Sequence, residues 1–457
     1  MQIKKIVSML LTSVLLVSLI GCKKGESLLT DGSNMSIENT DYGSKIRTEA
    51  LALRNFKSNN RGFNVAGSSQ DNAQADYIVN RFEQIGLNNI RKESINLDGW
   101  DITDLTFQFD CSCEDDVGEQ TFHNIGVYPS DFEYNETSFE IVNVGSFLTN
   151  KDINVKNKGV LLNSSDNLKQ EIEIAIKRDA VFVVYNDIND FLSNACKVDM
   201  GLDLPNSIPI FSLPKINYDI LEKELKDKNI LEVKLTGKSV LTKNIKSDFI
   251  IGEIEGKIKD EYIYITANRD SIFEGFLSSK VSVGELICLA ELLKNQNFIP
   301  KYTIRFMVTT GQEFGEIGKK NNIGIQRYID GLDNTTLKKI KYCIVLDGSK
   351  PLIGSVLTEY QTSDNILNQM LNNINDDIKK LNLGYMTTIN EISSSYITEG
   401  LVWAEYNIPV IIQAEPITSN YHYIENSSKD ESSLQIESNY CNYLMIYMYE
   451  ILKSLNK

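Results

Sequence analysis

Histidine is almost absent from this sequence: among 457 residues only His123 and His422 carry an imidazole. Zinc sites draw mainly on histidine and cysteine, so a centre that needs several imidazoles has too few ligands here. The seven cysteines offer no substitute, because Cys111 and Cys113 form the only close pair and no Cys-x-x-Cys repeat occurs. The cysteines therefore give no zinc-finger signal, a disulfide can be neither assigned nor excluded, and His123 is expected to be an ordinary loop or strand residue.

Basic residues are also in short supply. The chain has 46 Lys and Arg against 62 Asp and Glu, which gives a formal net charge of −16. A surface that binds phosphate backbones needs an excess of positive charge, so a nucleic-acid partner is not expected.

Long apolar runs are missing except at the start of the chain. Lys4 and Lys5 precede an apolar run over 6–20, which ends in Leu19-Ile20-Gly21-Cys22. This run is too short to span a bilayer and resembles a bacterial lipoprotein signal peptide with its lipobox. The resemblance implies that residues 1–21 are removed and that Cys22 is lipidated. It also implies anchoring of the protein to the extracytoplasmic face of the cell membrane. Residues 22–39, rich in Gly, Ser, Asn and Lys, are expected to be a flexible tether.

Periodicity divides the remaining chain into three parts. Residues 40–99 contain an amphipathic helix over 72–87, ended by Gly86. Residues 100–245 read as short strands at 159–162, 181–184 and 208–211, with helices at 170–178 and 218–225. That order resembles a protease-associated domain, a small α/β insertion.

Residues 246–457 alternate buried strands and helices. Strands are expected at 262–266, 303–308, 342–346 and 409–412, with a helix at 283–293. This alternation predicts a three-layer αβα sandwich with a mostly parallel central sheet, whose ligands bind beyond the carboxyl ends of the strands.

Several short segments in the expected order resemble the M28 family of zinc aminopeptidases. They are GSSQDNAQADYIVNRFEQIGL from Gly67, ANRDSIFEG from Ala267, KVSVG from Lys280, TGQEFGEIG from Thr310, LDG from Leu346, TEGLVWAEYNIPV from Thr398 and YHYIENS from Tyr421. The resemblance implies a zinc-aminopeptidase fold and a cleft that, in the family, holds two zinc ions bridged by one aspartate and one water.

The residues that correspond to the family's site are only partly suited to this chemistry. Asn268 takes the place of a histidine ligand, Lys280 that of the bridging aspartate, and Gln312 that of the glutamate that acts as general base. Ligand types are kept only at the following positions: Glu313, Asp347 and His422, together with Asp270, whose family role is to orient the missing histidine. The cofactor expectation is therefore no metal or one zinc ion.

A lysine in the bridging position suggests a different way to balance the charge of the site. We expect the ammonium of Lys280 to pair directly with Glu313 and Asp347 in place of the metal ions. The alternative is that Lys280 is a solvated residue at the start of a helix. No Asp or Glu lies between Gly275 and Gly284, so no small shift of the alignment restores the bridging carboxylate.

Three functions of different class remain open. The first is a catalytically inactive, lipid-anchored module that binds a peptide or a protein. The second is a hydrolase with one zinc on Glu313, Asp347 and His422, which Gln312 leaves without a general base. The third is a lysine-based catalyst in which Lys280 acts beside Ser278 or Ser279. Asn268, Lys280 and Gln312, which replace residues the family needs for catalysis, favour the first of these functions.

Overall fold

The computed structural model of the protein describes residues 40–59, 61–112, 117–163, 167–186, 195–196, 198, 204–205, 207–317, 319, 321–347, 357–392, 398–414 and 435–457. The predicted signal peptide, Cys22, the tether and His422 lie outside these ranges. Within them, no helix combines the length and the hydropathy that a membrane span requires.

A mixed sheet forms the centre of the core. Its strands follow the order β14 (Met386–Asn390), β13 (Leu357–Gln361), β15 (Val410–Ala414), β12 (Ile340–Asp347), β10 (Ile258–Asn268), β11 (Tyr302–Thr309) and β9 (Ile230–Ile254), and β1 (Asn88–Ile102) pairs with β9. The four strands β15, β12, β10 and β11 are parallel, whereas β13 and β9 are antiparallel to their neighbours β15 and β11. The sheet is thus parallel at its centre, as predicted, but mixed at both sides.

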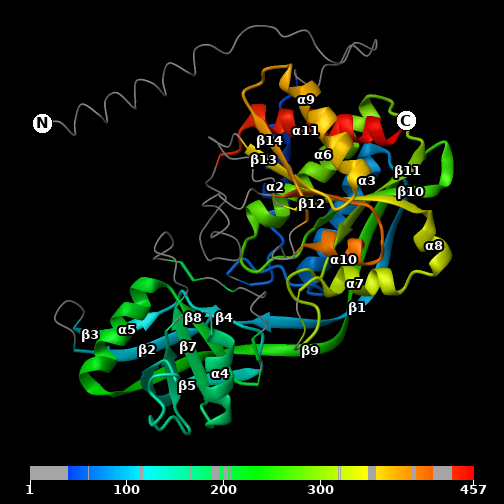
Figure 1. Ribbon diagram of the computed structural model, residues 1–457. Helices are drawn as coiled ribbons and strands as arrows, with labels where there is room; N and C mark the ends of the chain where they lie inside the picture. Colours follow the sequence, from blue (N-terminus) through cyan, green and yellow to red (C-terminus); the bar gives the residue numbers. More distant parts are fainter. Residues whose placement is uncertain are drawn as a thin grey trace, which may run out of the picture.

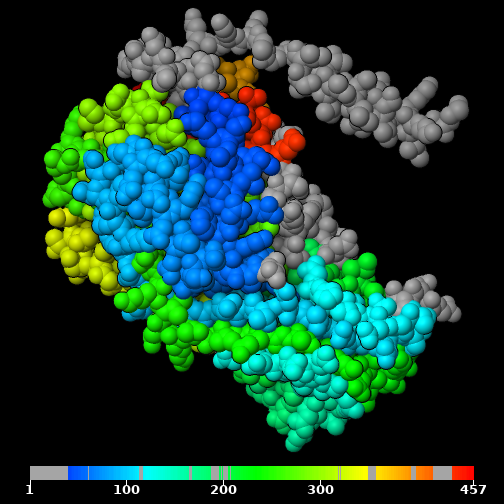
Figure 2. Space-filling view, turned by 180° about the vertical axis from the view of Figure 1, so that it is seen from behind, coloured from blue at the N-terminus to red at the C-terminus, as the bar shows by residue number. Residues whose placement is uncertain are grey.

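Helices cover both faces of this sheet (Figure 1). One face packs against α2 (Tyr42–Arg54), α3 (Ser69–Ile85), α6 (Val281–Asn295), α9 (Asn365–Lys379) and α11 (Ser438–Leu455). The other packs against α7 (Ile323–Asp330) and α10 (Glu399–Glu405), near the short α8 (Asn334–Lys339). Successive residues of β10 alternate between the two cores, since Ile263 and Ile265 face the first group and Tyr264 the second. Figure 2 shows α2 and α3, in blue, covering one side of the core.

A second α/β unit is inserted between β1 and β9. It contains β2 (Thr106–Cys111), β3 (Gly118–Phe122), β4 (Gly126–Val127), β5 (Phe132–Gly145), β6 (Gly159–Leu162), α4 (Leu168–Lys177), β7 (Phe182–Asn186), β8 (Ile210–Leu213) and α5 (Lys215–Lys228). Strands β5, β6, β7 and β8 are joined in parallel and share one hydrophobic core with α4 and α5. Strands β1 and β9 run side by side from the core into this insertion (Figure 1).

The sequence predictions of the regular elements are confirmed, with ends that differ by a few residues. The helix expected at 72–87 is α3, and Gly86 adopts the left-handed conformation (φ 78°) that ends it. The expected domain limits at 99/100 and 245/246 both fall inside continuous strands, β1 and β9. His123 lies exposed between β3 and β4. The described cysteines, Cys111, Cys196, Cys288, Cys343 and Cys441, are buried, and none is joined to another of them by a disulfide.

Candidate functional site

The site begins at the carboxyl end of β10, where Asn268 is the last strand residue. Its side chain is 5% exposed, and Nδ2 donates to the backbone oxygen of Asp270 at 3.0 Å. The Arg269 amide then donates to Thr309 O at the end of β11 (3.1 Å). The amide of Asn268 therefore closes its own loop through its nitrogen, a donor, which is the end of the group that cannot bind a cation.

Asp270 connects the two central loops of the site. Its Oδ1 accepts from the Gln312 amide at 3.2 Å and its Oδ2 from the Glu313 amide at 2.9 Å. Burial raises the pKa of Asp270, while these two backbone hydrogen bonds act to lower it. The aspartate, whose family role is to orient a histidine, here fixes the loop that carries Gln312 and Glu313.

Arg269, next to Asn268, is a buried cation at the base of the site. Its side chain is fully buried and forms an ion pair with Asp71 Oδ1 at 2.9 Å. It also donates to Thr309 O and to Ser247 Oγ, each at 3.3 Å. Asp71 in turn accepts from the Gly67 amide at 2.8 Å and from Ser247 Oγ at 2.6 Å. This network binds α3 and β9 to the base of the site.

Lys280 is buried at the point where a five-residue π-helix, η4 (Phe276–Lys280), meets α6. It is 1% exposed, and its Nζ donates to Arg269 O at 2.6 Å and to Ser271 Oγ at 3.0 Å. Burial lowers the pKa of Lys280 to about 7, against the opposing effect of the carboxylates of Asp270 and Asp71. The lysine thus reaches into the site, as expected of a residue in the bridging position.

The sequence expectation of a direct ion pair for Lys280 is wrong. Its described hydrogen bonds go to two neutral oxygens, so the expected direct ion pair with Glu313 and Asp347 does not form. The carboxylates of Asp270, Asp71 and Glu313 act on the Lys280 amine through their charge, whereas its two hydrogen bonds go to the loop that follows β10. The serine beside the amine is Ser271, whereas Ser279 Oγ donates to Gly275 O and Ser282 Oγ to Ser278 O.

The remaining candidate residues lie on neighbouring strand ends. Asp347 is the half-buried last residue of β12, and Gln312 and Glu313 follow β11. Glu313 is 8% exposed and Gln312 is half-buried. The order β12, β10, β11 therefore brings Asp347, Asp270 and Glu313 to one edge of the sheet. His422 lies outside the described residues.

Glu399 is a buried acid at this edge that the sequence analysis did not predict as a site residue. It opens α10, is 1% exposed, and accepts from Thr309 Oγ1 at 2.6 Å. Its second oxygen, Oε2, has no hydrogen bond of good geometry among the described residues, although Thr266 interacts with the carboxyl. Burial, reinforced by the charges of Asp270 and Asp347, raises the pKa of Glu399 to about 8. The acid is therefore mainly neutral at pH 7. The signal in the sequence was its place within the segment TEGLVWAEYNIPV.

These donors do not fit a two-zinc centre. A bridging position needs a carboxylate, and the residue to which the M28 resemblance assigns this position, Lys280, is an amine with two hydrogen bonds to protein oxygens. Within the described parts of the chain, no group of three or more His, Cys, Asp or Glu side chains is arranged to hold a metal ion. Asp347 and Glu313 are the described residues that retain zinc-ligand chemistry, and a single ion would additionally need His422.

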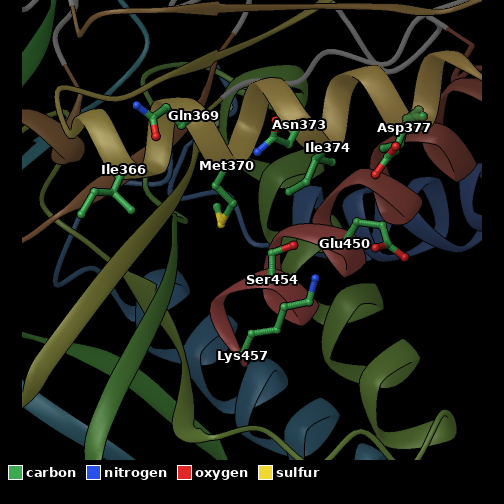
Figure 3. A pocket seen from close by; sticks show the side chains of 10 residues that line it. Ile366, Gln369, Met370, Asn373, Ile374, Asp377, Glu450, Ser454 and Lys457 are labelled. Atoms are coloured by element: carbon green, nitrogen blue, oxygen red, sulfur yellow. The ribbon is translucent and has the colours of Figure 1, made fainter.

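A separate groove of about 400 Å³ lies between α9 and α11, on the helical layer of the core. Met370 and Ile374 point from α9 toward the side on which Ser454 and Lys457 lie, near the end of α11 (Figure 3). None of the candidate site residues lines this groove. It is therefore a surface feature distinct from the strand-end site.

The protein has an α/β fold with a mixed sheet, similar to the fold of zinc aminopeptidases. Its structure is similar to a zinc aminopeptidase from Bacillus subtilis, with a TM-score of 0.70 and 17% identity over 93% of this chain and 97% of that one. It is also similar to a peptidase M28 precursor from Shewanella amazonensis, with a TM-score of 0.71 and 15% identity over 92% and 94% of the two chains. At such identities the likeness establishes the fold.

Sequence comparison adds the family of the core. Residues 250–440 match the profile of Peptidase family M28, so this part of the chain is an M28 peptidase-like domain. No curated protein matches the sequence. The M28 interpretation of the core, made from the motifs around residues 267–275 and 310–318, is thereby confirmed.

Proposed function

We propose that this protein is a catalytically inactive M28-type module that binds a peptide or a protein at the carboxyl edge of its central sheet. The observation that carries the proposal is the buried Lys280 amine, which fills the bridging position and donates to Arg269 O and Ser271 Oγ. An amine held in this way cannot bridge two cations. Gln312 in place of the general base has the same consequence, since an amide does not take up a proton near neutral pH.

The inserted α/β unit supports a binding role. Its order of strand, helix, two strands and helix (β6, α4, β7, β8, α5) is the order on which the protease-associated resemblance rests. We propose that it is a domain of this kind and that it contributes to ligand binding.

Zinc content tests the proposal directly. The full-length protein, purified without chelators, is expected to contain no stoichiometric zinc by plasma mass spectrometry. The Asn268→His/Lys280→Asp double variant restores the two missing ligand types and is expected to gain zinc. Lys294→Asp, a charge change of the same size on α6, serves as the matched control and should stay metal-free. Stoichiometric zinc in the parent, together with hydrolysis of an aminoacyl p-nitroanilide, would establish the one-zinc hydrolase instead.

We also propose that the protein is a lipoprotein, anchored through Cys22 to the extracytoplasmic face of the cell membrane. The lipobox-like sequence Leu19-Ile20-Gly21-Cys22 supports this. Radiolabelled palmitate should label the parent and not Cys22→Ala, and the variant should leave the membrane fraction. Labelling of the variant at the parent's level would refute the anchor.

A further inference from the structure

We propose that the inserted α/β unit positions the two cleft loops, 269–275 after β10 and 311–317 after β11, so that the candidate site keeps its shape only while the insertion is folded. Asp98 on β1 and the ring of Phe314 join the insertion to these loops. The inference deepens the proposed binding function, on which it rests, because it gives the insertion a way to act on the cleft.

The cleft loops belong to the hydrophobic core of the insertion rather than to the cores that flank the central sheet. Ile272, Phe273 and Phe314 are buried in one cluster with the strands and helices of the insertion. The nearby Phe276 and Leu277 belong instead to the cluster of the helical layer around α2, α6 and α11. The boundary between the two cores therefore falls inside the chain that follows β10, and not at the end of that strand.

Aromatic rings make much of the contact between the loops and the insertion. The ring of Phe314 packs edge-on against Trp100 on β1, with centroids 6.1 Å apart. Phe63 lies 5.4 Å from Trp100 and 4.8 Å from Phe273, again between ring centroids. The indole is fixed by a hydrogen bond from its Nε1 to Ser239 Oγ on β9 at 2.8 Å. Both loops thus pack, directly or through Phe63, against one indole on the paired strands that lead into the insertion.

Asp98 adds hydrogen bonds between these paired strands and the loop 311–317. Its backbone amide donates to Gly315 O at 2.8 Å, and its Oδ2 accepts from the Ile317 amide at 3.0 Å. Its Oδ1 accepts from the Asn244 amide on β9 at 3.3 Å. One carboxylate, on a residue that is 9% exposed, therefore holds β1, β9 and the cleft loop together.

The backbone of the loop lies directly on β1. A Cβ at Gly311 would lie 2.7 Å from Cδ1 of Leu97, and a Cβ at Gly315 would lie 3.1 Å from Cδ2 of the same leucine. The pairing of β1 with β9 shifts its register between Leu97 and Gly99, at the position of Asp98. A bulge of this kind re-aims the side chain that it contains, and here that side chain binds the loop.

The same loop is held at its other end by Asp270. The two oxygens of this aspartate accept the amides of Gln312 and Glu313, at 3.2 Å and 2.9 Å. The loop 311–317 is thus fixed at its start by the chain that follows β10 and at its end by Asp98 on β1. A change in the paired strands must therefore reach Gln312 and Glu313 through a short segment that is held at both ends.

The expected consequence is a coupling between the insertion and the cleft. A partner that stabilises the folded insertion should order the cleft loops, because both share one core. Coupling free energies are reciprocal, so a ligand bound in the cleft should stabilise the insertion to the same extent.

Hydrogen exchange of the full-length protein tests this coupling with two matched cavity variants. Ile172→Val removes one carbon from the insertion core on α4, and Ile451→Val removes one from the helical layer on α11; both side chains are fully buried. In Ile172→Val, peptides covering 269–275 and 311–317 should exchange about 2–10-fold faster, together with those of β7. In Ile451→Val the loop peptides should keep the parental rates. Unchanged loop exchange in Ile172→Val, or equal acceleration in Ile451→Val, would overturn the proposal.

The reverse experiment starts from the cleft. Phe314→Leu keeps the loop apolar but removes the ring contact with Trp100. It should accelerate exchange in β7 of the insertion more than in β12, although β12 belongs to the sheet whose edge carries the site. Acceleration of β12 as large as that of β7 would mean that the loop is part of the core of the sheet, and the proposal would fail.

Asp98→Asn tests the positioning residue itself. This change keeps the size of the side chain but replaces one acceptor oxygen by a donor, so one of its two amide partners loses its acceptor. Exchange of the Gln312 and Glu313 amides, whose hydrogen bonds go to Asp270, should also become faster. The exposed Asp101→Asn on the same strand is the matched control and should leave both amides at the parental rate. An effect of Asp98→Asn that stops at the Ile317 amide would refute the transmission.

The outcomes separate this inference from the proposed function. Cleft loops that ignore the insertion would leave a zinc-free binding module standing, because zinc content does not depend on the coupling. Stoichiometric zinc in the parent protein would instead remove the proposed binding function, whatever the exchange rates show.

Discussion

Two buried groups in the site, Lys280 and Glu399, are predicted to make the protein's stability depend on pH with opposite signs. Burial lowers the pKa of Lys280 from 10.5 to about 7, so the folded state binds fewer protons than the unfolded state between these values, and stability rises with pH. Burial raises the pKa of Glu399 from 4.5 to about 8. In that window the folded state binds more protons, and stability falls as pH rises.

The size of each effect follows from the linkage relation. Each pH unit inside the window is worth at most about 1.4 kcal/mol. Between pH 5.5 and 9 Lys280 should therefore add about 3 kcal/mol of unfolding free energy, and Glu399 should remove about 3 kcal/mol. The two contributions nearly cancel in the parent protein, which hides both.

Single substitutions separate the two contributions. Relative to the parent, Lys280→Met should lose about 3 kcal/mol across this pH range, and Glu399→Gln should gain a similar amount. Urea unfolding at half-unit pH steps measures the free energies, and the difference from the parent removes the contribution of all other groups. Lys294→Met and the exposed Glu405→Gln are the matched controls and should follow the parent. Parallel curves for parent, Lys280→Met and Glu399→Gln would refute the assignment of buried, shifted groups at these two positions.

Other substitutions test the packing and hydrogen bonds of the site, with urea unfolding as the measurement. Arg269→Met leaves Asp71 buried without its ion-pair partner and should cost about 3–5 kcal/mol, whereas Arg269→Met/Asp71→Leu should cost less than the single change; an equal or larger cost of the double change would contradict this. Asp270→Ala removes the acceptor of the Gln312 and Glu313 amides and should cost about 1–3 kcal/mol, with faster exchange of those two amides; unchanged exchange would count against the role given to Asp270. Ser68→Ala removes the side chain that caps α3 through the Asp71 amide and should cost about 1 kcal/mol; a neutral effect would mean that the cap is dispensable.

The fold of the core was predictable because its elements carry local signals. The apolar run at 262–266 predicts β10, and the helical spacing of apolar residues at 283–293 predicts α6. Strands β1 and β9 were not predicted. The polar segments 88–99 and 238–248 pair mainly with each other, so they lack the apolar run of a buried strand. The alternation of polar and apolar residues in one segment does not show which segment, about 150 residues away, pairs with it.

The candidate site was predictable in its positions and less so in its contacts. The motifs placed Asn268, Asp270, Glu313 and Asp347 at neighbouring strand ends, as the structure shows. The partners of Lys280 were not predictable, because whether a lysine bonds a carboxylate or a carbonyl oxygen depends on the π-helix that turns it inward. The Arg269–Asp71 pair joins residues far apart in the sequence and leaves no local pattern.

The network around Arg269 bears on how many changes would be needed to create a zinc site at this edge of the sheet. Arg269 and Asp71 neutralise each other, so the base of the site is held together by an internal ion pair and needs no added cation. Asp270, which fixes the 311–317 loop through two amides, likewise needs no histidine partner to stay in place. Lys280→Asp alone would put a carboxylate beside Asp270, Asp71 and Glu313, and it would still lack the imidazole at 268. The single change Lys280→Asp is therefore expected to add repulsion between carboxylates without creating a zinc site. The paired change at 268 and 280 adds both an imidazole and a carboxylate, which are the two missing ligand types.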